Sequence, residues 1–168
     1  MPEIQVLTPD DWPAWRELRL AALAESPRQF GARLADWQGA GDQPERWRAR
    51  LEIPGSLNLM AIHDGQPAGM VSGVPGQADG VIQLISMWVS PAARGTGTGH
   101  RLIAELIAWA AGSGASQLRL QVRPDNAPAI GLYERSGFGR AGPADGAVAA
   151  AGNGMTVLEM TRPLTAQD

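Results

Sequence analysis

Along the first third of the chain, the spacing of hydrophobic residues is typical of a strand in some segments and of a helix in others. An apolar run at residues 4–7 predicts a short opening strand, and helix-starting residues follow it. From Trp12 to Leu23 the apolar side chains recur at helical spacing, which predicts an amphipathic helix. Residues 28–43 contain three glycines and no clean period, so we expect a loop or a broken helix there. Residues 44–51, opened by a proline, predict a second helix.

The middle of the chain predicts a meander of three strands and then a long helix. Asp64-Gly65 lies between apolar runs at residues 57–63 and 66–74, a strong signal for a β-hairpin. Residues 81–89 form a third strand-like run. A glycine-rich turn follows, and the helix after it has one apolar face, made by Leu102, Ile103, Leu106, Ile107 and Ala110.

The last third alternates again between strand and helix signals. In order, it predicts a strand at 117–122, a helix at 127–136, a strand from Phe138, a mobile loop at 139–154, a strand at 155–160 and a frayed tail at 164–168. The chain shows no internal repeat. This order predicts one α/β domain over residues 1–168, with a mixed sheet and helices on its faces.

Composition narrows the class of protein. A chain of 168 residues that is 44% hydrophobic and 18% charged has the composition of one folded domain. It has no cysteine, which excludes disulfides, thiolate metal sites and cysteine nucleophiles, and no metal site is predicted. The net charge is −3, and the basic residues, all arginine, are spread thinly, so no nucleic-acid partner is expected. Neither a membrane span nor a signal peptide is evident, and we expect a cytoplasmic protein.

The chemical centre of the sequence is the turn Arg94-Gly95-Thr96-Gly97-Thr98-Gly99-His100, between a predicted strand and a predicted helix. Alternating glycines let the backbone approach a ligand, and the free N–H groups at a helix start favour an anion. Arg94 adds a guanidinium suited to phosphate, so the turn predicts a pyrophosphate cradle. The spacing fits neither a P-loop, which needs a lysine, nor a Rossmann fingerprint.

Two segments in order resemble the GNAT acetyltransferase family. Residues 87–99 resemble its acetyl-CoA motif, Q/R-x-x-G-x-G/A after V-x-P, and residues 126–138 resemble its N-x-x-A-x-x-x-Y-x-x-x-G-F segment. The resemblance implies a GNAT-like fold with a mostly antiparallel sheet of about seven strands and helices on both faces. It also implies an N-acetyltransferase that uses acetyl-CoA, whose thioester an amine attacks directly.

The resemblance also implies roles for individual residues of the cofactor site. The pantetheine arm would lie along the backbone of Met87, Trp88 and Val89, with the Trp88 side chain on the other side of the sheet. The pyrophosphate would be held by Arg94, Gly95, Thr96, Gly97, Thr98, Gly99 and His100. Asn126 and Tyr133 would lie along the pantetheine and thiol end.

Tyr133 is the candidate catalytic residue, because a phenol can protonate a departing thiolate. The alternative is a core aromatic side chain on the inner face of a short helix. The general base stays unassigned, since the strand at 81–89 contains no acid and no histidine. Gln83 and Ser86 could position a water, and the other candidates, all remote in sequence, are Asp36, His63, Asp79 and Glu159.

The acceptor is expected to be an amine of a small molecule or a peptide. Phe30, Asp36 and Trp37, from the irregular segment, could form its pocket, with aromatic walls and a carboxylate that orients an ammonium. Alternatively, the two aromatic rings simply seal the core. The rival function is a non-catalytic acyl-CoA-binding or sensing module. The sequence leaves the oligomeric state open, a homodimer included.

Overall fold

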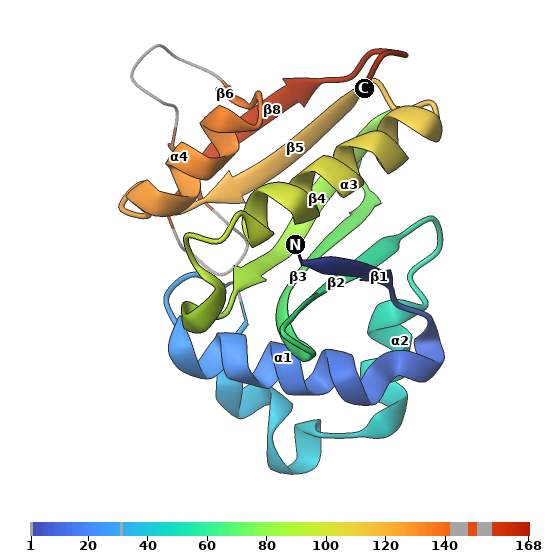
Figure 1. Ribbon diagram of the computed structural model, residues 1–168, viewed down its shortest axis with the longest axis vertical. Coiled ribbons are helices and arrows are strands. Elements are labelled where there is room, and N and C mark those ends of the chain that lie inside the picture. The colour runs from blue at the N-terminus through green and yellow to red at the C-terminus, as the bar shows by residue number, and fades with distance from the viewer. Residues whose placement is uncertain (1, 31, 142–147, 151–155) are drawn as a thin grey trace.

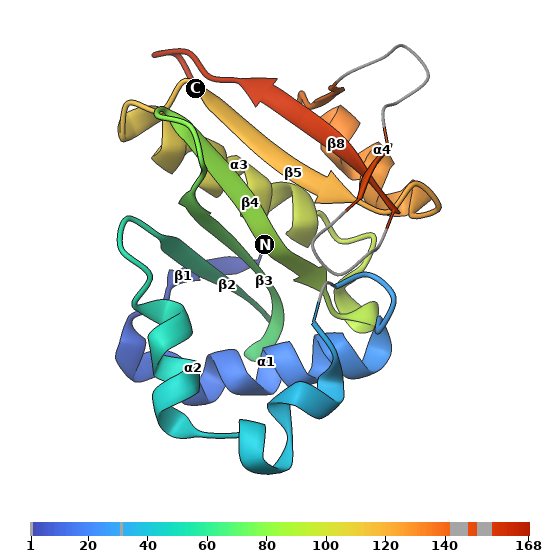
Figure 2. The same ribbon diagram turned by 180° about the vertical axis from the view of Figure 1, so that it is seen from behind.

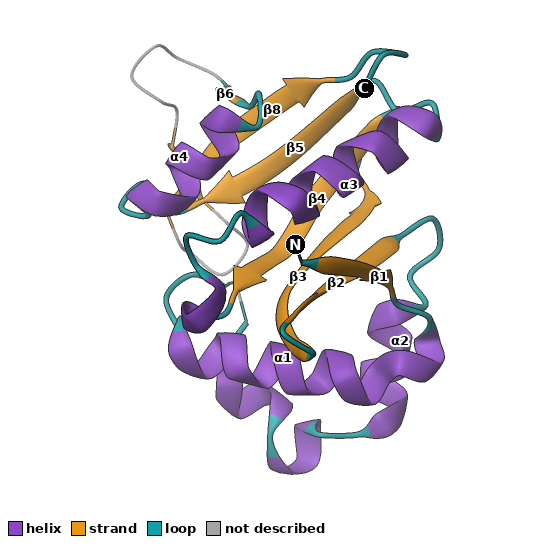
Figure 3. Ribbon diagram, viewed as in Figure 1, coloured by secondary structure: helices purple, strands orange, loops and turns teal. Residues whose placement is uncertain are grey.

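A computed structural model of the protein describes residues 2–30, 32–141, 148–150 and 156–168 (Figures 1 and 3). The α-helices within these residues are α1 (Trp12–Glu25), α2 (Pro44–Leu51), α3 (Thr98–Gly112) and α4 (Ala127–Arg135). The strands in the described residues are β1 (Glu3–Val6), β2 (Leu57–His63), β3 (Gln66–Pro75), β4 (Val81–Val89), β5 (Gln117–Val122), β6 (Gly139–Arg140), β7 (Val148–Ala150) and β8 (Thr156–Pro163).

All of these strands belong to one sheet, in the order β1-β2-β3-β4-β5-β8-β6, with the short β7 also paired to β8. Only the β4–β5 pair is parallel within the described residues, and the other pairs are antiparallel. A parallel pair needs a crossover connection, and α3 provides it between β4 and β5. The predicted mixed, mostly antiparallel sheet is therefore confirmed.

Helices cover both faces of this sheet, as the sequence predicted, and each face has its own core. On one face α3 and α4 lie against the strands, as Figure 1 shows, and Leu102, Leu106 and Tyr133 belong to this core. On the other face α1 and α2 pack their fully buried Trp15 and Trp47 near Met70 of β3. Figure 2 shows this second face, with α1 and α2 beside the β1–β3 part of the sheet.

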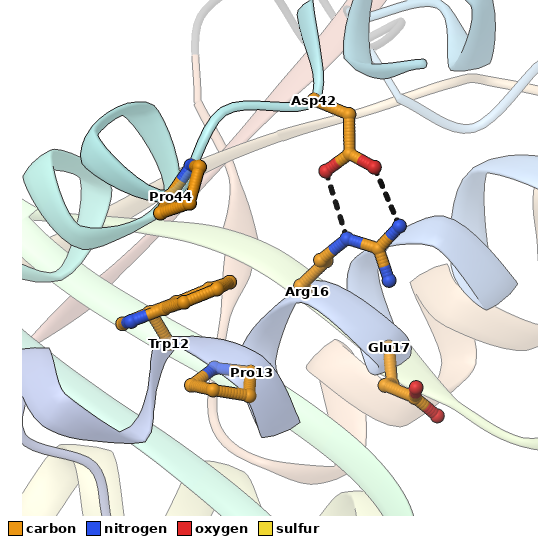
Figure 4. A pocket seen from close by; sticks show the side chains of 6 residues that line it. All are labelled: Trp12, Pro13, Arg16, Glu17, Asp42 and Pro44. Atoms are coloured by element: carbon orange, nitrogen blue, oxygen red, sulfur yellow. Dashed lines mark hydrogen bonds and ion pairs between the residues drawn. The ribbon is translucent and has the colours of Figure 1, made fainter. Parts of the chain in front are cut away.

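Asp42 joins α1, α2 and the irregular segment that connects them. Its carboxylate accepts hydrogen bonds from Arg16 Nε (2.8 Å) and Trp47 Nε1 (2.7 Å), and the guanidinium of Arg16 makes a second bond to it. These bonds, that of Arg16 foremost, lower the pKa of Asp42 to about 2. Figure 4 shows the ion pair beside a surface pocket of about 340 Å³, in which Trp12 lies next to two prolines. The pocket is therefore part of the α1–α2 junction.

Several sequence-based boundaries need correction. The segment predicted as loop or broken helix contains two short 3-10 helices, Leu34–Trp37 and Gly39–Gly41. The loop predicted at 139–154 includes the short strands β6 and β7, and its remaining parts, 142–147 and 151–154, lie outside the described residues. The last strand extends beyond its predicted end at Met160, to Pro163, because β5 pairs with it that far.

The C-terminal tail is attached to the end of β8. The tail, expected to fray, makes contacts, because Asp168 accepts hydrogen bonds from Arg162 Nη2 (2.8 Å) and from the Thr165 N–H (2.7 Å). Among the described residues, no helix combines the length and the apolar character needed to cross a membrane.

Candidate active site

The site begins where β4 and β5 separate. Their parallel pairing covers only residues 81–83 of β4 and 117–119 of β5, and Figures 1 and 2 show the two strands diverging toward their C-terminal ends. Beyond residue 83 the edge of β4 that faces β5 has no strand partner among the described residues. Unpaired strand edges can bind an extended ligand through main-chain hydrogen bonds, so this edge is a ready site for one.

A β-bulge in β4 shapes the same region. Ile85 pairs with Ser72 and Trp88 with Met70, so two residues of β4 lie opposite one residue of β3. Ser86, within the bulge, has φ of 56°, which is unusual for a residue other than glycine. Arg50 Nη2 donates a hydrogen bond to Ser86 Oγ (3.1 Å) and thereby connects the bulge to α2. Bulges bend a strand and re-aim its side chains, and this one lies at the point of separation.

A cleft of about 870 Å³ occupies the space between the diverging strands. It is lined by β4, the glycine turn, α4, the end of β5 and the end of α1. The residues predicted for the donor or the acceptor that line it are Phe30, Met87, Trp88, Val89, Arg94, Gly95, Gly97, Thr98, Gly99, His100, Asn126 and Tyr133. Residues of both family-like segments, 87–99 and 126–138, thus border one cleft although they lie far apart in the sequence.

The glycine turn presents backbone donors to this cleft. Gly95 and Gly97 have φ of 78° and 86°, in the left-handed region that L side chains rarely adopt. A Cβ added at Gly97 would meet nothing within 4 Å, because the residue borders open space. The first intrahelical bond of α3 runs from Arg101 N–H to Gly97 O, so the N–H groups of residues 98–100 precede the hydrogen-bonded ladder. These donors and the helix dipole suit a pyrophosphate.

Arg94 is held at the mouth of the cleft by the end of α1. Its Nη2 donates to Glu25 Oε2 (2.8 Å) and its Nε to the carbonyl oxygen of Val89 (3.0 Å). Glu25 also accepts hydrogen bonds from Ser26 Oγ and from Trp88 Nε1. These bonds, with that of Arg94 the largest effect, lower the pKa of Glu25 to about 2. Glu25 is a site residue that the sequence analysis missed.

Three further predicted donor-site residues have their side chains engaged in the protein. Thr96 does not line the cleft, and its hydroxyl lies 2.8 Å from Thr98 Oγ1 within the turn. The Trp88 ring is buried in the α1–α2 core, so only the rest of the residue can border the cleft. Asn126 caps α4 by accepting from the Ala129 N–H (3.3 Å), and its amide donates to Gln29 (2.8 Å). These side chains brace the site.

Tyr133 lies on α4 with its ring packed edge-on against Phe138, at 5.8 Å between ring centroids. It is 6% exposed and borders the cleft. Among the described residues, its phenol oxygen has no hydrogen-bond partner. Burial raises the pKa of Tyr133, so the phenol is protonated at neutral pH. An uncommitted O–H at the cleft wall has the character of a proton donor.

Two of the three residues predicted for the acceptor pocket lie elsewhere. Phe30 borders the cleft, but Asp36 and Trp37 do not. Trp37 stacks on Trp47 at 4.6 Å between centroids, under the guanidinium of Arg46. Asp36 pairs with Arg33 at 3.1 Å. The structure therefore places Asp36 and Trp37 away from this cleft, because the short 3-10 helix that carries them packs against α2.

The cleft also limits the choice of a general base. Ser86 and His100 border it, whereas Gln83, Asp36, His63, Asp79 and Glu159 do not. Glu25 is the carboxylate among the residues that line it, and its arginine partner makes it a weak proton acceptor. Within the described residues the site therefore combines a proton donor with no strong carboxylate base.

Comparisons with known proteins agree with this geometry. Residues 12–138 match the Acetyltransferase (GNAT) family. The chain belongs to the GNAT acetyltransferase family. It is 30% identical over 146 residues to a mycothiol acetyltransferase of Renibacterium salmoninarum, across 82% of this chain and 40% of that protein. It is 32% identical over 123 residues to the uncharacterised N-acetyltransferase YhfO of Bacillus subtilis, across 71% of this chain and 80% of that protein.

The structural comparison gives the same fold. The structure of yncA from Salmonella typhimurium with its cofactor acetyl-CoA superposes with a TM-score of 0.75 at 21% identity, covering 98% of this chain and 95% of that one. The predicted family, one of acetyltransferases, and the predicted fold are thus confirmed. The chain spans about 40% of the length of the mycothiol acetyltransferases that it matches.

Proposed function

We propose that this protein transfers the acetyl group of acetyl-CoA to a primary amine of a small molecule or peptide, by direct attack. The observation that carries the proposal is the cleft itself, where the open edge of β4, the start of α3 and the phenol of Tyr133 border one space. The residues fit the donor. Gly95 and Gly97 leave room where a Cβ would intrude, and unpaired N–H groups follow them.

Each part of the cleft has a task in this proposal. Acetyl-CoA, when bound, supplies the activated thioester. The N–H groups at residues 97–100 hold the pyrophosphate, and the β4 edge around Met87 and Val89 orients the extended arm. The Val89 N–H is the candidate donor to the thioester oxygen as charge develops on it. The new bond joins the amine nitrogen to the acetyl carbon, and the bond between that carbon and sulfur breaks.

Protons are then balanced by Tyr133 and by water. Tyr133 Oη gives its proton to the departing thiolate: burial keeps the phenol protonated until the thiolate forms, and its hydroxyl is free of other partners among the described residues. The attacking nitrogen loses a proton to water, since the cleft's carboxylate, Glu25, is bound to Arg94. Bulk solvent restores the Tyr133 proton. The amine must reach the site as the neutral base, so we expect turnover to rise with pH until the acceptor is deprotonated.

A direct assay tests this function. The purified protein is incubated with acetyl-CoA and a panel of primary amines, and both free CoA thiol and acetylated amine are measured. We expect stoichiometric formation of both products with at least one amine. Tight binding of acetyl-CoA without transfer to any amine in a broad panel would favour the non-catalytic module instead. We further propose a cytoplasmic location, where acetyl-CoA is available. A measurement of the mass in solution will decide between a monomer and a homodimer.

A further inference from the structure

Two arginines lie behind the wall of the cleft on its α1–α2 side. Arg50, on α2, donates a hydrogen bond to Ser86 Oγ (3.1 Å) in the β4 bulge, and Ser86 borders the cleft. Arg19, on α1, holds its guanidinium 4.8 Å from the centre of the Phe30 ring, which also borders the cleft. Arg50 in turn lies 4.9 Å from the ring of Trp15, one helical turn before Arg19. Both cations thus contact residues that face the ligand space.

Neither cation has an anionic partner within the described residues. Arg50 donates to two neutral oxygens, Ser86 Oγ and Asn58 Oδ1 (3.0 Å). Arg19 Nη1 is buried and has no hydrogen-bond partner. Desolvation lowers the pKa of each to about 10, and the charge of Arg50 contributes for Arg19. Both are still cationic at neutral pH.

Such an arrangement is costly for the folded protein alone. A buried charge without a counter-charge loses hydration, and two like charges repel each other. The ring contacts with Phe30 and Trp15 and the neutral hydrogen bonds of Arg50 offset this cost only in part. Arginines elsewhere in the fold, such as Arg16 and Arg94, are paired with carboxylates. Glu25, the carboxylate at the cleft, is already engaged by Arg94. An anion brought by a ligand would therefore supply the missing partner.

Resting on the proposed function, we propose that Arg19 and Arg50 recognise an oxyanion on the acceptor, so that the protein acetylates amines that carry a carboxylate or phosphate. The guanidinium fork is the group best suited to such oxyanions. Ser86 precedes Val89 by three strand residues, roughly 10 Å at about 3.3 Å per residue. An acceptor with its amine at the thioester and its oxyanion near Ser86 therefore carries the two groups about 10 Å apart, with its chain on the α1–α2 side of β4 and the donor's arm on the β5-facing edge.

A length series of acceptors tests this specificity. The probes are ω-amino acids from glycine to 6-aminohexanoate, each paired with its carboxamide, and O-phosphoethanolamine paired with ethanolamine. The measurement is kcat/KM at saturating acetyl-CoA. We expect the acids of one preferred length to exceed their amides by at least about 30-fold. Preference for O-phosphoethanolamine over every acid would assign the oxyanion as phosphate. Equal rates for charged and neutral partners throughout would overturn the proposal.

Variants connect the preference to the two side chains. Arg19→Met should reduce the acid-to-amide ratio to within about threefold while the rate with the amides changes little, and Arg19→Lys should keep part of the ratio. Arg50→Gln, which removes the charge and keeps an N–H donor, should act in the same direction. The matched control is Arg48→Met, an exposed α2 arginine paired with Asp10, which should leave the ratio unchanged. An unchanged ratio in both Arg19→Met and Arg50→Gln would refute the assignment.

Two further readouts separate recognition from a structural role and from failure of the proposed function. Removing an unpaired cation should leave the Tm of Arg19→Met equal to wild type or raise it by about 2–4 °C, whereas a structural arginine would lower it. Calorimetric titration of each acid and of O-phosphoethanolamine into the protein saturated with CoA should show binding of at least one of them, which Arg19→Met weakens at least tenfold. Binding without any acetyl transfer would refute the activity and retain the anion site, and no binding of any acid or phosphate would refute the site.

Discussion

Replacing Tyr133 by Phe removes a single oxygen atom from the wall of the cleft. The ring is 6% exposed and packs edge-on against Phe138, and Phe preserves this contact. The hydroxyl has no hydrogen-bond partner among the described residues, so no internal bond is lost. The hydroxyl borders the cleft and is not one of the fully buried unpartnered atoms of the described residues, so the variant should be about as stable as wild type. Any loss of activity is then a loss of chemistry.

The size of that loss follows from the role of a positioned acid. We expect kcat to fall by about 10- to 1000-fold, which corresponds to about 1.4–4 kcal/mol in the activation barrier. The affinity for acetyl-CoA should change little, because the glycine turn and the β4 edge are untouched.

Single-turnover release of CoA thiol, calorimetric binding of acetyl-CoA and thermal unfolding measure the three quantities separately. Phe138→Leu is the control, and it should lower Tm while reducing the single-turnover rate much less. An unchanged single-turnover rate in Tyr133→Phe would refute the assignment of Tyr133 as the acid.

Other substitutions and conditions test the rest of the account. Gly97→Val should abolish acetyl-CoA binding and cost at least about 1–2 kcal/mol of stability, because φ of 86° disfavours an L residue. The control is Gly112→Ala, at a glycine without positive φ, which should leave both acetyl-CoA binding and stability unchanged. Trp37→Ala should lower the free energy of unfolding by on the order of 1–3 kcal/mol and leave the KM for the amine unchanged, since the ring packs on Trp47 and Arg46. A several-fold rise in KM with unchanged Tm would instead assign Trp37 to the acceptor pocket. Asp42 and Glu25 have pKa values lowered to about 2, so their contribution to stability is full above about pH 5 and is lost as the pH falls toward 2. The free energy of unfolding in urea, measured across this window, should depend less on pH in Asp42→Asn than in wild type. An identical pH dependence in the two proteins would contradict the ion pair.

The sequence was most informative where local rules act alone. The Asp64-Gly65 turn defined a hairpin because both residues adopt positive φ there, as the structure has them. The glycine turn and the following amphipathic helix could also be predicted. Backbone positions with positive φ favour glycine, and a buried helix face needs apolar residues at helical spacing, so both features are visible in the sequence. The relative placement of two motifs more than thirty residues apart followed from the family resemblance, and the cleft brings them together.

What escaped the sequence depends on contacts between distant segments. Ser86 adopts a positive φ in the bulge without being glycine, and the hydrogen bond from Arg50 that accompanies this conformation comes from another element. Glu25 reaches the cleft only because α1 ends beside the glycine turn, 69 residues before its partner Arg94. Trp37 was assigned to a pocket because its segment has no period, but tertiary packing on α2 decides where that ring lies.

If the opening between β4 and β5 is the acyl-donor site, a crystal structure of the protein with acetyl-CoA will show the cofactor there. We expect the pyrophosphate within hydrogen-bond distance of the N–H groups of residues 97–100. We expect the extended arm along residues 84–89 of β4, with the thioester sulfur near Tyr133 Oη. Acetyl-CoA bound outside this cleft, or bound in it with its sulfur far from Tyr133, would contradict this assignment of the site.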